Sequence, residues 1–343
     1  MMDRYRKQIL FQGVGEDGQH ALLNSRVTLI GCGALGSVIA QTIVRAGFGF
    51  VRIVDRDFVD LSNLQRQVLY DESDVEERLP KVVAAAKKLE QINSEITIEP
   101  VLKDVTCENI LSLIEDVDLI IDGTDNFEIR FLINDAAVEK KIPWIHAGCV
   151  GSHGQVMTII PGETPCLRCL MPDIPDPGSA ETCDTAGVLA SAIQVVSSLQ
   201  VVDAIKLLTG QRELISQSLT IVDVWEGTFR KLDISNLNAN QSCPCCSGDD
   251  RQWLNGEKGS QSTVLCGRDS VQISPAGKLG LTFDQLEEKL KALGEVKNNS
   301  FLLIFKPSDS DHEFTIFQNG RAIISGTEDL SEARQLYTRY LGN

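Results

Sequence analysis

Two groups of residues in this sequence have types and spacings that could support chemistry: a glycine-rich string and two closely spaced cysteine pairs. The string GCGALG lies between a short apolar run, Val27–Ile30, and a segment with helical spacing, Leu35–Ala46. Glycines at such a junction allow a tight turn and let backbone N–H groups approach a phosphate at the helix N-terminus. The sequence therefore predicts a nucleotide site, whose first candidate residues are Gly31, Gly33, Ala34 and Gly36.

An acidic residue, Asp55, ends the next apolar run, Val51–Val54. A glycine loop followed by such an acid is typical of dinucleotide sites, where the carboxylate binds ribose hydroxyls, so an NAD-dependent oxidoreductase is one interpretation. Other residues favour a triphosphate, because cations beside a magnesium-binding carboxylate suit triphosphate chemistry better than hydride transfer. These further candidates are Asp57, Ser62, Asn63, Arg66, Lys81, Asp125 and Asn126.

The cysteine pairs have the spacing of metal ligands. Cys166 and Cys169 form one Cys-x-x-Cys pair, and Cys243 and Cys246 form another. Four thiolates make a closed tetrahedral site for structural zinc, with no position left open for catalysis. Cys245 could replace Cys246 with a different loop geometry, and we expect Cys246 to be the ligand.

Strands and helices are predicted to alternate over the first half of the chain. Helices are expected at Leu79–Ile92 and Phe127–Lys140, and strands at Ile96–Val101, Val117–Ile121 and Pro143–His146. A longer helix is expected at Val188–Thr209. This alternation predicts the α/β class, as a Rossmann-like, doubly wound and mainly parallel sheet.

The domain organisation follows from changes in composition. We expect a nucleotide-binding domain with the cysteine pairs over residues 1–248, a polar linker over 249–263, and a small α+β domain over 264–343. For the last domain the pattern predicts a helix, three strands and a helix, at Phe283–Leu293, Phe301–Phe305, Glu313–Phe317, Arg321–Ile324 and Leu330–Tyr340.

Charge and composition limit the partners. The formal net charge is −16, and such an acidic chain repels a phosphate backbone, so no nucleic-acid partner is expected. No signal peptide and no run of apolar residues long enough for a membrane span is evident, so we expect a cytoplasmic protein without a membrane partner. In that reducing compartment the ten cysteines are not expected to form disulfides.

Taken in order, these motifs resemble those of the ThiF/MoeB/HesA family, relatives of the adenylation domain of ubiquitin-activating enzymes. The resemblance runs from about Tyr5 to Gly248. It implies a homodimeric adenylyltransferase that uses ATP and magnesium to activate the C-terminal Gly-Gly carboxylate of a ubiquitin-like sulfur-carrier protein, ThiS-like or MoaD-like. The pathway would be thiamine or molybdopterin biosynthesis. The C-terminal domain resembles bacterial ThiF-type extensions, which favours the thiamine branch.

The resemblance also implies roles for individual residues. Asp55 would hold the ATP ribose, Asp125 would bind magnesium, and the residues around the phosphates would be Asn63, Arg66 and Lys81. Cys183 matches in position a cysteine that forms a covalent sulfur linkage with the carrier in some members. The family usually has an arginine where this chain has Lys7, a residue that reaches the ATP site of a dimer partner. Either Lys7 or its neighbour Arg6 would make that contact.

Two other functions are compatible with the same residues. The chain could be a carrier-binding scaffold without catalysis, or it could adenylate the C-terminus of a peptide in a modification pathway. The presence of Arg66, Lys81 and Asp125 together favours an active enzyme. Arg66, Lys81, Asp125 and Cys183 are therefore the candidate catalytic residues.

Overall fold

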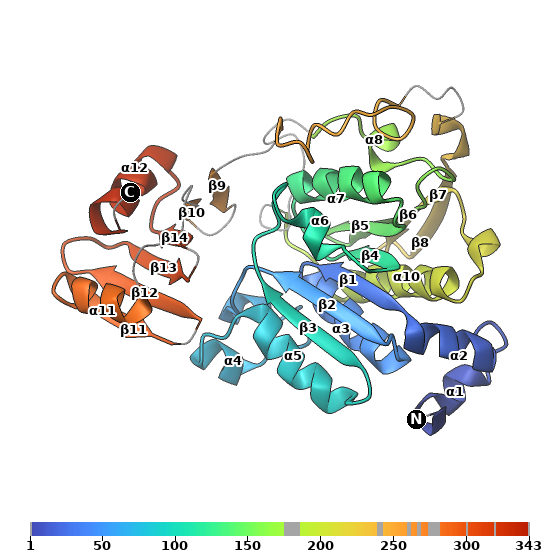
Figure 1. Cartoon of the computed structure of the whole chain (residues 1–343), viewed down its shortest axis with the longest axis horizontal. Helices are drawn as coiled ribbons and strands as arrows, with labels where there is room; N and C mark the ends of the chain where they lie inside the picture. The colour runs from blue at the N-terminus through green and yellow to red at the C-terminus, as the bar shows by residue number, and fades with distance from the viewer. Residues whose placement is uncertain are drawn as a thin grey trace. The chain divides into compact units, whose positions relative to one another are not determined.

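The computed structural model describes residues 2–174, 186–238, 243–258, 262–265, 269–273, 282–299, 301–318 and 320–341. The chain forms two compact units, Met1–Lys258 and Gly259–Asn343. Each unit has a sheet of its own (Figure 1).

The first unit is built on an eight-stranded sheet with the order β3-β2-β1-β4-β5-β6-β7-β8. Neighbouring strands from β3 to β5 are parallel, and from β5 to β8 they are antiparallel. This confirms the predicted mainly parallel α/β sheet. The strands are β1 (Arg26–Ile30), β2 (Phe50–Asp55), β3 (Thr97–Leu102), β4 (Leu119–Asp122), β5 (Trp144–Val150), β6 (His153–Ile159), β7 (Ser218–Asp223) and β8 (Thr228–Asp233).

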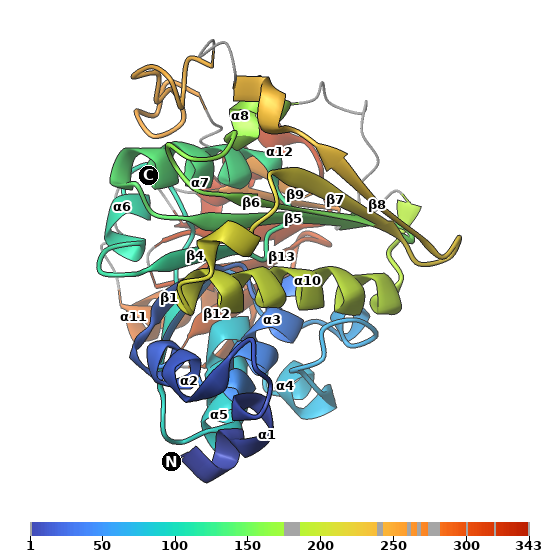
Figure 2. The same ribbon diagram turned by 90° about the vertical axis from the view of Figure 1, so that its right-hand side faces the viewer.

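Helices cover both faces of this sheet. Figure 2 shows α6 (Ile110–Leu113) and α7 (Phe127–Lys140) on one side, and α3 (Ala34–Ala46) and α10 (Ala190–Leu208) on the other. The remaining helical segments are η1 (Met2–Tyr5), α1 (Arg6–Ile9), α2 (Gly15–Asn24), η2 (Leu61–Asn63), α4 (Glu72–Glu76), α5 (Lys81–Ile92), α8 (Leu167–Leu170), η3 (Arg212–Leu214) and η4 (Ser235–Asn238).

Burial explains why these segments take these forms. All four residues of β4 are buried, as expected for a central parallel strand covered on both faces. Helix α3 ends where Gly47 adopts a left-handed conformation with φ of 85°, which a glycine does without steric cost. By length and apolar composition α10 could cross a membrane, but here it packs along α3, β5 and β6.

The predicted linker 249–263 is shorter in the structure. Residues up to Lys258 belong to the first unit, where Trp253 is buried and packs against Phe131 with ring centroids 5.3 Å apart. The composition of residues 249–258 is mostly polar and therefore predicted a linker. The segment nevertheless packs on the first unit, because the single large aromatic side chain of Trp253 is buried there.

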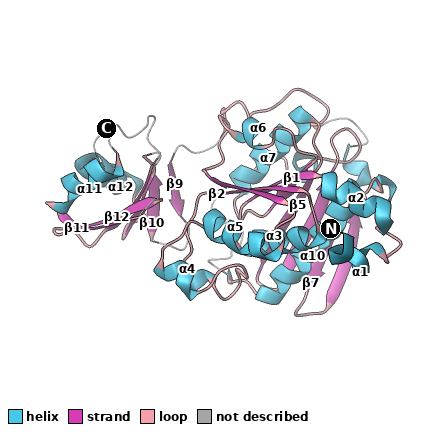
Figure 3. Cartoon of the chain, turned by 60° about the horizontal axis from the view of Figure 1, so that its bottom comes forward, coloured by secondary structure: helices cyan, strands magenta, loops and turns pink. Residues whose placement is uncertain are grey.

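The second unit is a six-stranded antiparallel sheet with the order β11-β12-β13-β14-β10-β9. Its strands are β9 (Ser262–Leu265), β10 (Ser270–Ile273), β11 (Gly294–Asn298), β12 (Leu302–Pro307), β13 (Glu313–Phe317) and β14 (Ala322–Ser325). The prediction of three strands was therefore too low. Its helices are α11 (Phe283–Lys291) and α12 (Leu330–Leu341), and both pack into one core with the sheet (Figure 3).

Candidate active site and cysteine cluster

The glycine loop joins β1 to α3 and lies against the loop that follows β4. Gly31 has a φ of 89°, and a Cβ there would lie 2.7 Å from the carbonyl oxygen of Gly123. A Cβ on Gly36 would lie 2.0 Å from the carbonyl oxygen of Gly31. These positions therefore require glycine. Gly33 precedes α3 as its N-cap residue and Ala34 begins the helix.

Asp55 organises this loop from the end of β2. Its carboxylate accepts hydrogen bonds from the backbone N–H of Cys32, across 2.7 Å, and of Asp57, also across 2.7 Å. Burial raises the pKa of the Cys32 thiol to about 12, so this thiol is protonated at neutral pH and is not a nucleophile.

Lys81 is a buried cation beside the same loop. It is the first residue of α5, its backbone N–H donates to the carbonyl oxygen of Asp57, and its Nζ lies 3.2 Å from Oδ2 of Asp57. Asp57 is in turn bonded to Asp55. The structure thus links Asp55, Asp57 and Lys81 into one polar chain at the carboxyl end of β2.

The segment with Ser62, Asn63 and Arg66 is a short turn fixed by Asp60. The Asp60 carboxylate accepts from the backbone N–H of Ser62, across 2.8 Å, and Asn63 is buried with its side chain accepting from the backbone N–H of Asp60. The Arg66 guanidinium donates to the carbonyl oxygen of Ser62, across 2.9 Å. No carboxylate lies within ion-pair distance of it among the residues that the structure describes. The Arg66 guanidinium is therefore available to bind an anionic ligand.

Asp125 and Asn126 lie in the loop that follows β4. Asp125 is exposed, and Asn126 caps α7 by accepting from the backbone N–H of Ile129. Because Gly123 of this loop contacts Gly31, the exposed Asp125 lies in a loop that borders the glycine loop. Lys7 is exposed on α1, which packs against η1 and α2. Cys183 lies outside the described residues.

A buried charged cluster next to Asp125 was not predicted from sequence. Asp122, at the end of β4, lies 3.0 Å from Nδ1 of His146 on β5 and 3.2 Å from Nε of Arg130 on α7. Thr124 donates to Asp122 through its N–H and its hydroxyl. Burial raises the pKa of Asp122, but Arg130 and the His146 hydrogen bond hold it below its ordinary value overall. The only signal in the sequence was an acid at the end of a buried strand.

The four predicted metal ligands come together. The sulfur atoms of Cys166, Cys169, Cys243 and Cys246 all lie within 4.8 Å of one another. Cys166 and Cys243 are 3.7 Å apart, and Cys169 and Cys246 are 3.4 Å apart. Such a closed set of four thiols has the number and type of donors that structural zinc prefers.

Comparison with known proteins decides the family. The family model described as ThiF family matches residues 5–245. The chain belongs to the ThiF family. The Sulfur carrier protein ThiS adenylyltransferase of Bacillus subtilis is 41% identical over 343 residues, 100% of both chains. The Sulfur carrier protein adenylyltransferase of Thermus thermophilus is 38% identical over 256 residues, which are 73% of this chain and 93% of that protein.

A solved structure has a similar fold. The crystal structure of E. coli MccB with MccA-N7isoASN superposes with a TM-score of 0.63 at 22% identity, over 72% of this chain and 75% of that one. The ThiF-family match spans the glycine loop, the loop with Asp125 and three of the four clustered cysteines. The fourth, Cys246, follows the last matched residue directly.

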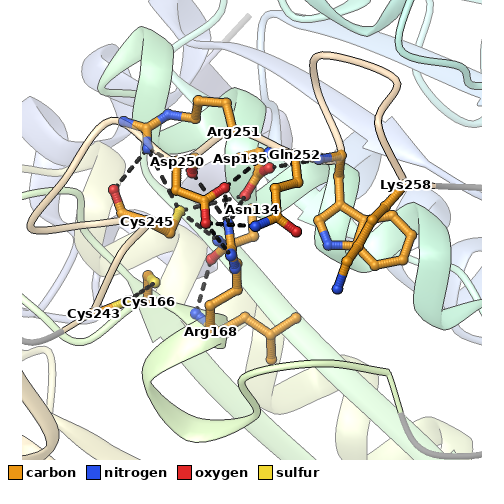
Figure 4. A network of polar contacts seen from close by, with 12 residues as sticks. Asn134, Asp135, Cys166, Arg168, Cys243, Cys245, Asp250, Arg251, Gln252 and Lys258 are labelled. Atoms are coloured by element: carbon orange, nitrogen blue, oxygen red, sulfur yellow. Dashed lines mark hydrogen bonds and ion pairs between the residues drawn. The ribbon is translucent and has the colours of Figure 1, made fainter.

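In this ThiF-family chain the sulfur of Cys245 is not part of the cluster formed by the other four cysteines. Its sulfur accepts from the Asn134 amide, across 3.3 Å, and lies 3.4 Å from Oδ1 of Asp135 (Figure 4). The other amide atom of Asn134, Oδ1, accepts from the backbone N–H of Leu167 in the first cysteine pair. Arg168, within that pair, bonds to both Asp135 and Asp250. The network holds the two cysteine pairs against α7.

Proposed function

We propose that this ThiF-family chain is an enzyme that uses ATP to adenylate the C-terminal Gly-Gly carboxylate of a ubiquitin-like sulfur-carrier protein. The products are a carrier acyl-adenylate and pyrophosphate. The names of the relatives from Bacillus subtilis and Thermus thermophilus support this reaction. The observation that carries it is the link between the buried cation Lys81 and the glycine loop: Lys81 lies 3.2 Å from Asp57, and the Asp55 carboxylate bonds both Asp57 and Cys32 of the loop. A cation held at such a loop suits a polyphosphate.

The chemistry requires two anions to meet. The carboxylate of the carrier attacks the α-phosphate, so the site must neutralise charge and hold the two groups in line. Gly31, Gly33, Ala34 and Gly36 would let the backbone approach the phosphates, and Arg66 and Lys81 would supply positive charge. Asp55 would bind the ribose, while the remaining polar residues would line the nucleotide site, namely Asp57, Ser62, Asn63 and Asn126.

Magnesium fits the loop after β4. Asp125 is an exposed carboxylate with no hydrogen bond among the residues that the structure describes, and hard divalent cations prefer such oxygen donors. When bound there, magnesium would neutralise phosphate charge. Zinc fits the cluster of Cys166, Cys169, Cys243 and Cys246, whose closed geometry suits a structural and not a catalytic metal.

Three parts of the proposal concern partners. The carrier is ThiS-like or MoaD-like, and the match with the Bacillus subtilis protein over its full length favours thiamine biosynthesis. A homodimer would let Lys7 or Arg6 reach the ATP site of the second copy. Cys183 would act after adenylation, in sulfur transfer, because the adenylation step uses the carrier carboxylate as its nucleophile.

The test is carrier-dependent exchange of pyrophosphate into ATP, with a ThiS-type carrier ending in Gly-Gly. Lys81→Ala and Asp125→Ala should each lose exchange by about a hundredfold or more while remaining folded, because both groups act on charge in the transition state. Lys88→Ala, on the same helix as Lys81 but paired with Asp71 and Asp74, is the control and should keep exchange. Wild-type rates in either site variant would refute the assignment. Carrier binding without exchange in the wild type would favour the scaffold.

A further inference from the structure

Helix α10 buries two polar side chains, Ser197 and Gln200, on the side of the sheet that it shares with α3 (Figure 2). Both residues are 0% exposed, and residues spaced in this way lie on one face of a helix. The Ser197 hydroxyl donates to the carbonyl oxygen of Leu35, across 3.3 Å. Because burial of a polar side chain costs free energy unless hydrogen bonds offset it, hydrogen bonding and not space filling explains why these residues lie in the core.

The Gln200 amide lies where strands β4 and β5 cease to pair. The last paired residues of these strands are Ile121 and Ile145, although β4 continues to Asp122. Nε2 of Gln200 donates to the carbonyl oxygen of Asp122, across 2.8 Å, and to that of Ile145, across 3.3 Å. One amide group thus bonds both strands at the point where their own ladder ends, and it fixes the separation of the strands there.

The other amide atom of Gln200, Oε1, is buried and has no hydrogen-bond partner among the residues that the structure describes. The orientation of the amide follows from its acceptors, because an oxygen in place of Nε2 would face two carbonyl oxygens. A buried acceptor without a partner is destabilising, and an apolar side chain of similar length would avoid that cost. The two bonds from Nε2, and not a gain in packing, therefore explain a glutamine at this position.

Both backbone segments that α10 bonds belong to the proposed nucleotide site. Leu35 is part of the glycine string, and Asp122 leads into the loop that carries Asp125. The two segments are in close contact, because a Cβ on Gly123 would lie 2.5 Å from the carbonyl oxygen of Gly31. A shift at the end of β4 would therefore move Asp125 and disturb the glycine loop.

We propose that Gln200 is a positioning residue for the adenylation reaction: by bonding β4 and β5 where their pairing ends, it sets the place of the loop with Asp125 relative to the glycine loop. This inference rests on the proposed function. Gln200 acts through backbone atoms and touches neither nucleotide nor carrier. Because Asp125 is the magnesium candidate, the effect of Gln200 is expected in the magnesium dependence and not in the affinity for the carrier.

Gln200→Met is the main variant, because it keeps the length of the side chain and removes the donor. Gln194→Met is the first control, since Gln194 is exposed on the same helix. Thr158→Val is the second control, because it deletes a hydroxyl that donates to the Asp203 carboxylate of α10, across 2.8 Å, without bonding either loop. A loss that reflects only a loosened α10 should appear in Thr158→Val as well.

ATP binding should be measured by calorimetry with and without magnesium, and carrier-dependent exchange should be measured at varied magnesium. Gln200→Met should bind ATP alone like the wild type, but it should lose most of the gain in ATP affinity that magnesium provides. It should also need about tenfold more magnesium for half-maximal exchange, with the KM for carrier unchanged. Both controls should keep the magnesium dependence of the wild type.

A wild-type magnesium dependence in Gln200→Met would overturn the proposal. An equal change in Thr158→Val would also overturn it, because Gln200 would then be a purely structural residue. Absence of exchange in the wild type would instead refute the proposed function, while the calorimetric comparison would still judge the role of Gln200.

Gln200→Glu keeps the test decisive if Gln200→Met does not fold. Burial favours the protonated form of a carboxyl group, and a protonated Glu can donate to one of the two carbonyl oxygens. Relative to the wild type at the same pH, Gln200→Glu should therefore recover magnesium-dependent ATP binding at about pH 6 and lose it at about pH 8. Wild-type binding at both pH values would contradict the proposal.

Discussion

The phenolic hydroxyl of Tyr70 donates a hydrogen bond to the backbone carbonyl oxygen of Cys32, across 2.7 Å. Tyr70 is buried and lies four residues after Arg66 in the sequence. This hydrogen bond therefore connects the segment that contains Arg66, a candidate for phosphate binding, to the glycine loop. A buried hydroxyl bonded to a loop carbonyl restricts the loop at little cost in side-chain entropy.

Tyr70→Phe should therefore raise the KM for ATP severalfold and lower the free energy of unfolding by about 1 kcal/mol, the usual contribution of one hydrogen bond. Tyr337→Phe is the control, because it deletes the same hydroxyl from a 2.7 Å bond to the carbonyl oxygen of Gly320 in the second unit. It should leave the KM for ATP unchanged. Equal ATP kinetics in both variants would show that the bond does not order the loop. Pyrophosphate exchange at varied ATP gives the measurement.

The metal prediction concerns the cysteine cluster. Purified protein should contain one zinc per chain, and Cys166→Ser or Cys246→Ser should lose both the zinc and cooperative unfolding, because metal binding contributes directly to folding. Cys245→Ser should keep the zinc, since the Cys245 sulfur lies against Asn134 and Asp135, outside the set of four. Elemental analysis measures the zinc content of each variant, and thermal denaturation measures whether its unfolding is cooperative. If Cys245→Ser loses the zinc while Cys246→Ser keeps it, Cys245 and not Cys246 is the fourth zinc ligand.

Acid should destabilise the protein through His146. Burial, aided by the charge of Arg130, lowers the pKa of this histidine below its ordinary 6.5, against the effect of its bond to Asp122. As the pH falls through 6.5 the unfolded chain gains a proton at this position and the folded chain does not, so stability falls from there downward.

The free energy of unfolding of the wild type should therefore decrease between pH 7 and 5 with an added slope of up to about 1.4 kcal/mol per pH unit. His146→Asn should remove that part of the slope. Acid loss of metal affects both proteins alike, so the difference between their slopes isolates His146. Denaturant titrations at several pH values provide the data, and identical slopes would contradict the prediction.

The first unit could be predicted well because its signals are local. Apolar runs ended by glycine or an acid placed β1, β2 and β4 to within a few residues, and the glycine string fell where backbone contacts require it. The Asp122, Arg130 and His146 cluster could not be found this way. Its members come from three separate elements, and only the fold shows that their charges meet.

The second unit shows a different limit. Strand β11 is an edge strand whose middle residue, Val296, is flanked by charged or polar residues, so it lacks the alternation that marks a strand buried on one face. Strand β10 buries the polar residues Ser270 and Gln272, which bond to Ser325 and Arg321. A buried polar residue needs a hydrogen-bond partner, and the partners of Ser270 and Gln272 lie about 50 residues further along the chain, so the local sequence pattern does not show that these residues are buried.

The boundary between the units gives the last prediction. A truncated chain of residues 1–258 should bind ATP with the affinity of the full chain, because the contacts of the nucleotide-binding candidates all lie within Met1–Lys258. A chain of residues 1–248 should be less stable by about 3 kcal/mol or more, since burial of one tryptophan contributes that much. It would lose Trp253 from its place against Phe131, and Asp250 from its ion pair with the buried Arg168. Denaturant unfolding and calorimetric ATP binding should be measured on both. Loss of ATP binding in the 1–258 chain would refute the boundary, and equal stability of the two chains would show that residues 249–258 are only a linker.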